Sequence, residues 1–82
     1  MYALVLNEAA AQVLAISSRT LQRQVSAILD GLKADPFRSG DFQQTDATGR
    51  IHQVALLGDW LITYWSDHAV REVRIVNLEW IE

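Results

Sequence analysis

The 82-residue sequence contains no cysteine, one proline and two histidines. The absence of cysteine excludes disulfide bonds, thiolate nucleophiles and cysteine metal ligands. With only His52 and His68 available, a zinc site would need carboxylates to complete its ligand shell, and no closely spaced cluster of His, Asp and Glu offers them. We therefore expect neither a metal nor another cofactor.

Long apolar runs are also missing. No stretch approaches the roughly 20 residues that cross a bilayer, and the start MYALVLNEAAA lacks the basic residues and long apolar run of a signal peptide. We therefore expect a soluble, cytoplasmic protein that does not engage a membrane. Half of the chain is nevertheless hydrophobic. That is enough for one small core and too little for two, which predicts a single domain over residues 1–82.

Positive charge is scarce. Seven Lys and Arg oppose ten Asp and Glu, which gives a net charge of −3. A protein dedicated to nucleic acid usually presents a dense basic surface to the phosphates, so the composition argues against such a protein. The cations are unevenly placed along the chain, however, and several could converge on one face: Arg19, Arg23, Lys33, Arg38, Arg50, Arg71 and Arg74.

The first half of the chain has the pattern of a strand followed by two helices. Residues 2–6 alternate as a short strand, and Asn7 is placed to cap a helix over about residues 8–16. Either of the next two serines can cap a second helix, which Asp35-Pro36 ends because the residue before proline avoids helical backbone angles. The apolar residues on one face of this second helix are Leu21, Val25, Ile28, Leu29 and Leu32.

The second half alternates as β-strands do. Residues 54–57 are apolar on both faces, as expected of a buried central strand. Gly58-Asp59 predicts a tight turn, after which Trp60, Ile62 and Tyr64 share one strand face. The predicted strands cover residues 51–57, 60–65 and 70–76, with a loop before them that holds a short edge strand at 42–45.

This order of elements predicts the α+β class. An N-terminal strand and a two-helix hairpin precede a three- to four-stranded antiparallel sheet, and the helices pack on one sheet face. The N-terminal strand is expected to join the sheet as well, because a solitary strand cannot satisfy its own backbone hydrogen-bonding groups.

Several segments, taken in order, resemble the RelE/ParE superfamily of type II toxin–antitoxin systems. The resemblance covers nearly the whole chain and includes Asp35-Pro36-Phe37 after the second helix and the Gly40 loop. The segment Gly58-Asp59-Trp60-Leu61-Ile62-Thr63-Tyr64 is similar to the superfamily signature Gly-Asp-aromatic-Arg-hydrophobic-x-Tyr. Its Asp-Trp-Leu part is closest to the YafQ/RelE-like branch.

The resemblance implies a toxin that a cognate antitoxin neutralises. Toxins of the RNA-cleaving branches enter the ribosome and cut mRNA by a metal-free acid/base mechanism. That chemistry needs a base for the ribose 2′-hydroxyl, a cation beside the phosphate and an acid for the leaving oxygen. The implied partners are thus an antitoxin, the ribosome and mRNA, and the three tryptophans also suit an interface with a second copy of the chain.

Five residues match the catalytic roles that the resemblance implies: Arg50, His52, Asp59, Tyr64 and Arg74. Arg74 could bind phosphate, His52 could act as base or acid because an imidazole ordinarily titrates near neutrality, and Tyr64 could donate a proton. Four of the five also have a structural interpretation, and that of His52 is an exposed position on the first hairpin strand. Asp59 suits the turn, and Tyr64 suits core or edge packing. Arg74 can pair with Glu72 on its own strand face.

The sequence departs from the superfamily where cations are usual. Leu61 stands at the signature arginine, and Val54 and Leu56 stand where basic residues often occur. Asn77-Leu78-Glu79 replaces a more basic end of the last strand. Two other functions therefore stay open. One is a non-enzymatic ParE-like toxin that binds DNA gyrase, and the other is a catalytically inert interaction module that keeps the partner-binding surface.

Overall fold

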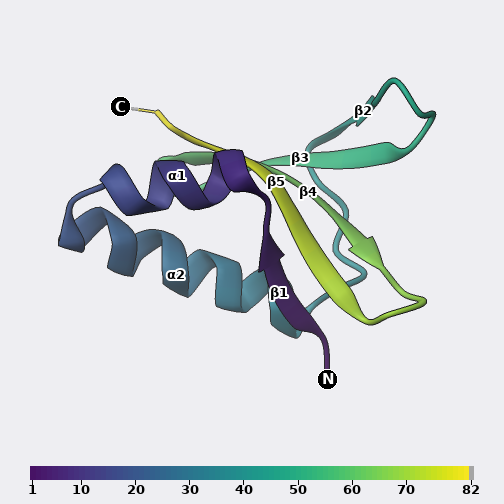
Figure 1. Ribbon diagram of the computed structural model, residues 1–82, viewed down its shortest axis with the longest axis horizontal. Coiled ribbons are helices and arrows are strands. Elements are labelled where there is room, and N and C mark those ends of the chain that lie inside the picture. Colours follow the sequence, from purple (N-terminus) through teal and green to yellow (C-terminus); the bar gives the residue numbers. More distant parts are fainter. Residues whose placement is uncertain (82) are drawn as a thin grey trace.

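A five-stranded sheet carries both helices on one face (Figure 1). The computed structural model describes residues 1–81, and the strand order across the sheet is β1-β5-β4-β3-β2. The elements are β1 (Ala3–Leu6), α1 (Glu8–Ile16), α2 (Arg19–Ala34), β2 (Phe42–Thr45), β3 (Ile51–Leu57), β4 (Trp60–Asp67) and β5 (Glu72–Trp80). The predicted α+β class and element order are confirmed.

Side-chain caps fix the starts of both helices. The Asn7 side chain accepts a hydrogen bond from the Ala10 amide at 2.9 Å, and Ser18 Oγ accepts one from the Leu21 amide at 3.2 Å. Asp35 follows the last residue of α2, where the adjoining proline prevents another turn. Neither helix in the described part of the chain is long and apolar enough to cross a membrane.

The N-terminal strand joins the sheet, as predicted, but it runs parallel to its neighbour. It pairs with β5 from Ala3 opposite Glu72 to Leu6 opposite Ile75. The remaining neighbours, β2 to β5, pair antiparallel. The sheet therefore consists of the predicted antiparallel set of four strands and one parallel edge strand.

The last strand differs most from its predicted range. It begins at Glu72 instead of residue 70, because Arg71 takes a φ of 56° in the preceding turn. It then continues to Trp80, and a register shift beside Thr63 and Tyr64 changes which residues face the core. The predicted tail thus extends the strand, while Glu82 lies outside the described residues.

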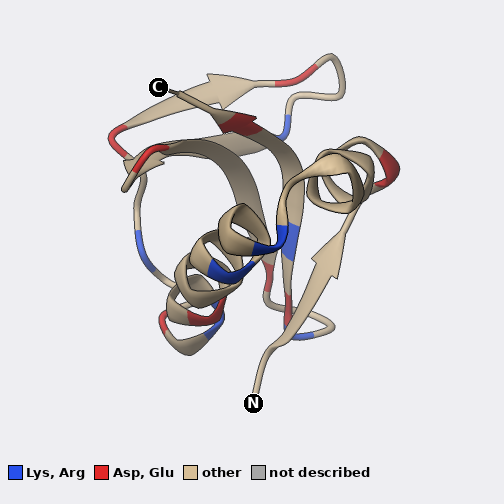
Figure 2. Cartoon of the chain, turned by 90° about the vertical axis from the view of Figure 1, so that its left-hand side faces the viewer, with Lys and Arg blue, Asp and Glu red and all other residues tan. Residues whose placement is uncertain are grey.

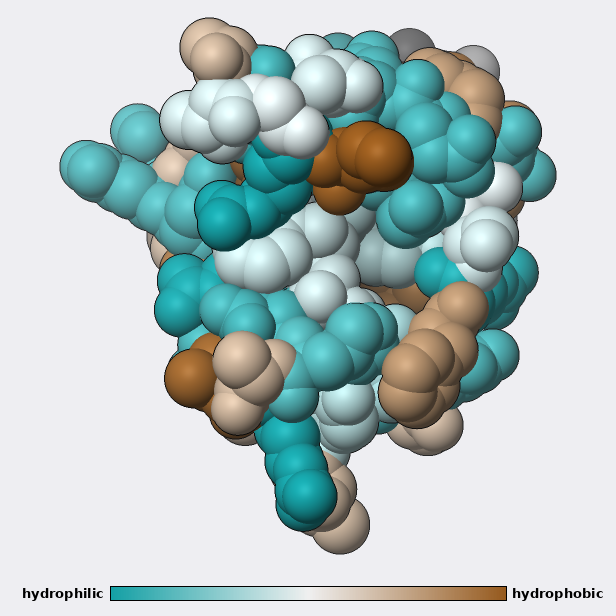
Figure 3. All heavy atoms as spheres, turned by 90° about the vertical axis from the view of Figure 1, so that its right-hand side faces the viewer, coloured by the Kyte–Doolittle hydropathy of each residue, from teal (hydrophilic) through white to brown (hydrophobic). Residues whose placement is uncertain are grey.

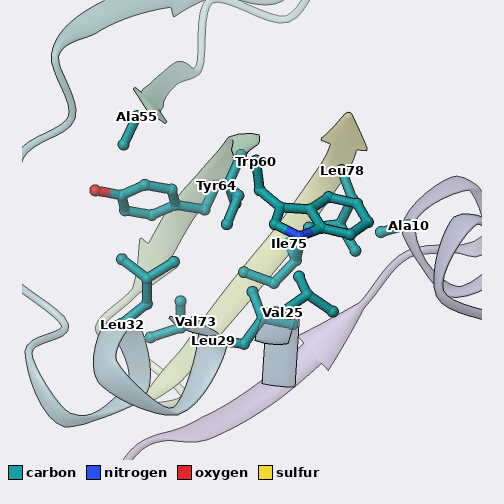
Figure 4. Packing of buried hydrophobic residues seen from close by; sticks show 11 residues of the cluster. Ala10, Val25, Leu29, Leu32, Ala55, Trp60, Tyr64, Val73, Ile75 and Leu78 are labelled. Atoms are coloured by element: carbon teal, nitrogen blue, oxygen red, sulfur yellow. The ribbon is translucent and has the colours of Figure 1, made fainter. Parts of the chain in front are cut away.

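The core lies between α2 and the helix-covered face of the sheet (Figure 4). Trp60, Ile62 and Tyr64 are buried together, which confirms the predicted face of β4. Leu56 is 55% exposed, so the prediction that residues 54–57 are buried on both faces is wrong at this position. The other members of the core cluster are Ala10, Val25, Leu29, Leu32, Ala55, Val73, Ile75 and Leu78.

The sheet splits between β3 and β4. These strands pair only from Gln53–Tyr64 to Leu57–Trp60. Beyond that point β3 stays with β2 and β4 stays with β5, so the two hairpins diverge (Figure 1). The loop after α2 crosses the split, where the Arg38 carbonyl accepts a hydrogen bond from the Tyr64 hydroxyl and the Gly40 amide donates to Gln53 Oε1. A hollow of the outer sheet face lies at this split.

Candidate functional site

A groove opens where the hairpins diverge, on the face of the sheet opposite the helices. Tyr64 and Ile75 form a buried pair across β4 and β5, and Trp65 and Arg74 form the next pair. Because side chains alternate between the two faces of a strand, Trp65 and Arg74 lie on the outer face. The groove has a volume of about 370 Å³. Figure 3 views this end of the molecule, where hydrophilic side chains surround scattered apolar ones. Its polar and aromatic walls include Asp46, Arg50, His52, Trp65 and Arg74.

Asp46 holds His52 at one wall of the groove. Asp46 Oδ2 lies 3.2 Å from His52 Nε2, and the His52 side chain is only 13% exposed. The other carboxylate oxygen, Oδ1, accepts hydrogen bonds from the Thr48 amide, the Thr48 hydroxyl and the Arg50 amide. The Thr48 hydroxyl is the largest cause that lowers the pKa of Asp46, followed by the backbone amides and His52. An ionised Asp46 therefore orients an imidazole toward the groove.

Two guanidinium groups lie beside Trp65. The Arg50 guanidinium carbon is 3.9 Å from the centre of the indole ring, and that of Arg74 is 5.8 Å away. Arg74 also donates from Nη2 to Glu72 Oε1 at 2.6 Å, so the predicted pairing of these residues is observed. The exposed Arg50 and the partly exposed Arg74 together offer positive charge and hydrogen-bond donors to an anionic group in the groove.

The structure brings together three of the five predicted site residues. His52 lies on β3, Arg74 lies on β5, and Arg50 ends the loop before β3. Of the seven Lys and Arg residues, Arg50 and Arg74 are the ones that line the groove. Arg19, Arg23 and Lys33 lie on α2 instead, and Figure 2 shows the basic residues spread along that helix and elsewhere on the chain.

Tyr64 and Asp59 lie apart from this group. The Tyr64 side chain faces the core at 2% exposure and donates to the Arg38 carbonyl at 3.1 Å. Burial is the main cause that raises the pKa of Tyr64. Asp59 lies in the β3–β4 turn, which follows the end of β3, whereas His52 lies near the start of that strand. The Asp59 carbonyl accepts a hydrogen bond from the Ile81 amide. Neither residue lines the groove.

Asp46 and Trp65 were not among the predicted site residues. The sequence signal for Asp46 was its place two residues before Thr48 and four before Arg50, a spacing that lets one carboxylate bond successive backbone amides in a loop. Nothing local marks its contact with His52, which depends on the β2–β3 pairing. The strand alternation puts Trp65 on the face opposite Tyr64, but it does not report the arginine neighbours of Trp65, which come from two other segments.

No group of three or more His, Asp or Glu side chains within residues 1–81 is arranged to hold a metal ion. The groove instead combines one imidazole with two guanidinium groups. These groups can exchange a proton and bind a phosphate, which are the functions that acid/base chemistry on a phosphodiester requires.

No protein-family model matches the sequence, and no curated protein matches it either. Solved structures do. A chain of the toxin–antitoxin complex RelBE2 from Mycobacterium tuberculosis aligns at a TM-score of 0.78 with 18% identity, covering 96% of each chain. The isolated E. coli RelE toxin aligns at 0.76 with 15% identity, covering 100% of this chain and 86% of that one.

A third similar structure is the archaeal RelE–RelB complex from Pyrococcus horikoshii, with a TM-score of 0.71 and 16% identity. That alignment covers 96% of this chain and 93% of the archaeal one. All three alignments span nearly the whole described chain at low identity. The chain therefore has the fold of these RelE structures, which confirms the fold that the sequence resemblance implied.

Proposed function

We propose that this chain is the toxin of a type II toxin–antitoxin system and that it cleaves mRNA on the ribosome without a metal. The observation that carries the proposal is the groove: an imidazole held by Asp46 lies in the same hollow as two arginines beside Trp65. The RelE fold of the chain supports it, since the similar structures are RelE toxins and RelB–RelE complexes.

His52 is the proposed general base. With Nε2 directed at Asp46, Nδ1 is the ring nitrogen left to take the proton from a ribose 2′-hydroxyl. The 2′-oxygen then attacks the adjacent phosphorus, and the bond from phosphorus to the 5′-oxygen breaks. The products are a 2′,3′-cyclic phosphate and a free 5′-hydroxyl, which receives its proton from water.

Arg50 and Arg74 are the proposed phosphate-binding groups. Negative charge accumulates on the phosphate oxygens in the transition state, and fixed guanidinium donors stabilise it. Trp65 restrains Arg50 by direct stacking at 3.9 Å. Glu72 restrains Arg74 by its ion pair. Tyr64 and Asp59 have no role in this mechanism, because one is buried in the core and the other lies at the far end of β3.

A cognate antitoxin is the proposed protein partner. Strands β1 and β2 are the two edges of the sheet, and each has one free side on which a partner strand could pair. Large apolar side chains are also exposed on β3, next to the β2 edge, including Ile51 and Leu56. A partner segment with apolar side chains would cover them.

A cell-free translation reaction tests the proposal. The purified wild-type protein should reduce protein synthesis and leave mRNA cut at defined positions. The variant His52→Ala should cut about a hundredfold to ten-thousandfold more slowly, because it removes the general base. Intact mRNA with a folded wild-type protein would contradict the ribonuclease proposal, and inhibition of DNA gyrase supercoiling instead would favour the ParE-like alternative.

A further inference from the structure

A second feature of the surface lies outside the proposed catalytic groove. The Phe37 ring stacks on His68, with ring centres 4.5 Å apart and planes within 10° of parallel. Tyr2 meets both rings edge-on, and its hydroxyl oxygen lies 2.6 Å from His68 Nδ1 in a hydrogen bond. Three segments that are distant in sequence thus build one aromatic platform from Tyr2, Phe37 and His68.

The platform presents an unused ring face. Phe37 is 74% exposed although an aromatic side chain of this size normally gains free energy by burial. His68 covers one side of the ring and Tyr2 approaches it edge-on. The neighbours therefore orient the ring without burying it, which is the arrangement of a stacking surface.

A pocket of about 300 Å³ adjoins this platform. Phe37 and His68 line it together with Arg38, Ser39, Gln53 and Ser66, whose donors and acceptors suit the polar edge of a planar ring. Trp65 also lines this pocket, and Trp65 is a wall of the catalytic groove as well. A single extended ligand can therefore reach from the arginines to the platform past one shared side chain.

We propose that the Phe37–His68 platform and its pocket form a subsite for an unpaired nucleobase of a single-stranded RNA. The proposal rests on the RNA-cleaving function proposed above, and it adds a position outside the groove that binds a base rather than a phosphate. Every base has a flat face, so stacking on Phe37 retains the strand without strong sequence preference. It also supplies affinity that this acidic chain cannot obtain from cations alone.

The test is binding of a short, fluorescein-labelled single-stranded RNA whose 2′-oxygens are methylated so that it cannot be cut. Anisotropy at low salt measures the affinity of the wild type, Phe37→Ala and the matched control Phe42→Ala, which removes another exposed phenylalanine ring on β2. We expect Phe37→Ala to weaken binding between about fivefold and about a hundredfold. Phe42→Ala should bind as the wild type does, and Phe37→Trp should restore affinity.

A second set of RNAs, each lacking one base, identifies the contact. Loss of the base that stacks on Phe37 should weaken binding to the wild type and leave binding to Phe37→Ala nearly unchanged. The subsite alone would be overturned if Phe37→Ala and Phe42→Ala bound RNA with equal affinity. It would also be overturned if every abasic RNA weakened binding to the wild type and to Phe37→Ala by the same factor. Failure of the folded wild type to bind any RNA would also overturn the subsite, whereas the ribonuclease proposal stands or falls on the cell-free translation reaction.

A protein partner is the other occupant that an aromatic platform could serve. If Phe37→Ala weakens binding of an antitoxin but leaves the RNA affinity at the wild-type value, the platform is a protein-docking surface and the nucleobase proposal is overturned. Circular dichroism of each variant checks that the fold is intact, and the high exposure of Phe37 makes a folding defect unexpected.

Discussion

Asp46 Oδ2 lies 3.2 Å from His52 Nε2, and it joins the β2–β3 loop to the strand that follows it. The other oxygen of this carboxylate accepts three hydrogen bonds from Thr48 and Arg50, so the loop holds the carboxylate in place independently of its contact with His52. Asp46 therefore acts on the proposed reaction through His52. It is a positioning residue, because its oxygens are already engaged by protein groups.

The substitution Asp46→Asn tests this relationship. The amide keeps the size of the side chain but removes the charge that faces the His52 imidazole. We expect RNA cleavage to slow by roughly tenfold to a hundredfold, since small displacements of a catalytic group have effects of this size. Single-turnover cleavage measures the effect.

Asp41→Asn is the matched control for this substitution. Asp41 also accepts a hydrogen bond from a backbone amide, that of Leu56 at 2.7 Å, but it does not line the groove. The control should cut RNA at the wild-type rate. An equal loss in both variants would mean that loop stability, rather than the contact with His52, accounts for the effect.

The lowered pKa of Asp46 predicts how this residue affects stability as the pH changes. A carboxyl group whose pKa in the fold lies below its ordinary value of 3.8 stabilises the protein above that ordinary value. This contribution is lost as the pH falls through the lower, folded-state pKa. Urea unfolding measures the free energy of unfolding of wild type and Asp46→Asn. The difference between the two values should therefore be constant at neutral pH and should shrink below about pH 4. A difference that grows on acidification would contradict it.

The two arginines beside Trp65 predict a salt-dependent contribution to RNA binding. Replacing either with glutamine should reduce the slope of log affinity against log salt by about 0.7, the value for one phosphate contact on a single strand. Cleavage should also slow by about a hundredfold or more, because the charge at the phosphate loses a fixed donor. Arg23→Gln on α2 is the control and should leave both quantities unchanged.

Local patterns were sufficient to predict most of the fold. Asn7, the apolar face of α2 and Asp35-Pro36 determine where the helices lie, because caps and periodicity act within a few residues. The bounds of β5 were less predictable. Its start depends on the backbone of Arg71, and its later course depends on a register shift against β4; both are set by pairing between strands rather than by local preference.

The candidate site was predictable in part for the same reason. Arg50, His52 and Arg74 could be proposed from residue type, but only the split between β3 and β4 shows which face they share. Tyr64 was proposed as a proton donor from its residue type and its place in the turn signature. Its strand face, which the alternation did predict, places it in the core instead. Contacts such as Asp46–His52 and Phe37–His68 depend on the geometry of loops, which the repeat patterns of helices and strands in the sequence do not predict.

The position of Tyr64 gives a prediction that separates stability from catalysis. Tyr64→Phe keeps the buried ring and removes the hydrogen bond to the Arg38 carbonyl, which should lower the free energy of unfolding by about 0.5–1.5 kcal/mol. Cleavage by the folded variant should match the wild type. Because burial raises the pKa of Tyr64, its phenol should ionise only at higher pH than an ordinary tyrosine, and wild-type stability should fall as the pH rises through that range. A loss of cleavage without a loss of stability would restore Tyr64 to the catalytic group.

Gly40 and Gly31 offer a matched pair that tests how the α2–β2 loop is held against the sheet. A Cβ added at Gly40 would lie 2.5 Å from the Val54 carbonyl oxygen and 2.7 Å from the Val54 nitrogen, and neither backbone atom can move without disturbing β3. Gly40→Ala should therefore lower the free energy of unfolding by about 1–3 kcal/mol. Gly31 lies inside α2, and apart from its chain neighbours and the nearby helix backbone no atom lies within 4 Å of such a Cβ, so Gly31→Ala should raise stability by about 0.5–1 kcal/mol through better helix propensity. Chemical denaturation measures both, and an unchanged or stabilised Gly40→Ala would mean that the loop does not pack against Val54 as closely as the structure places it.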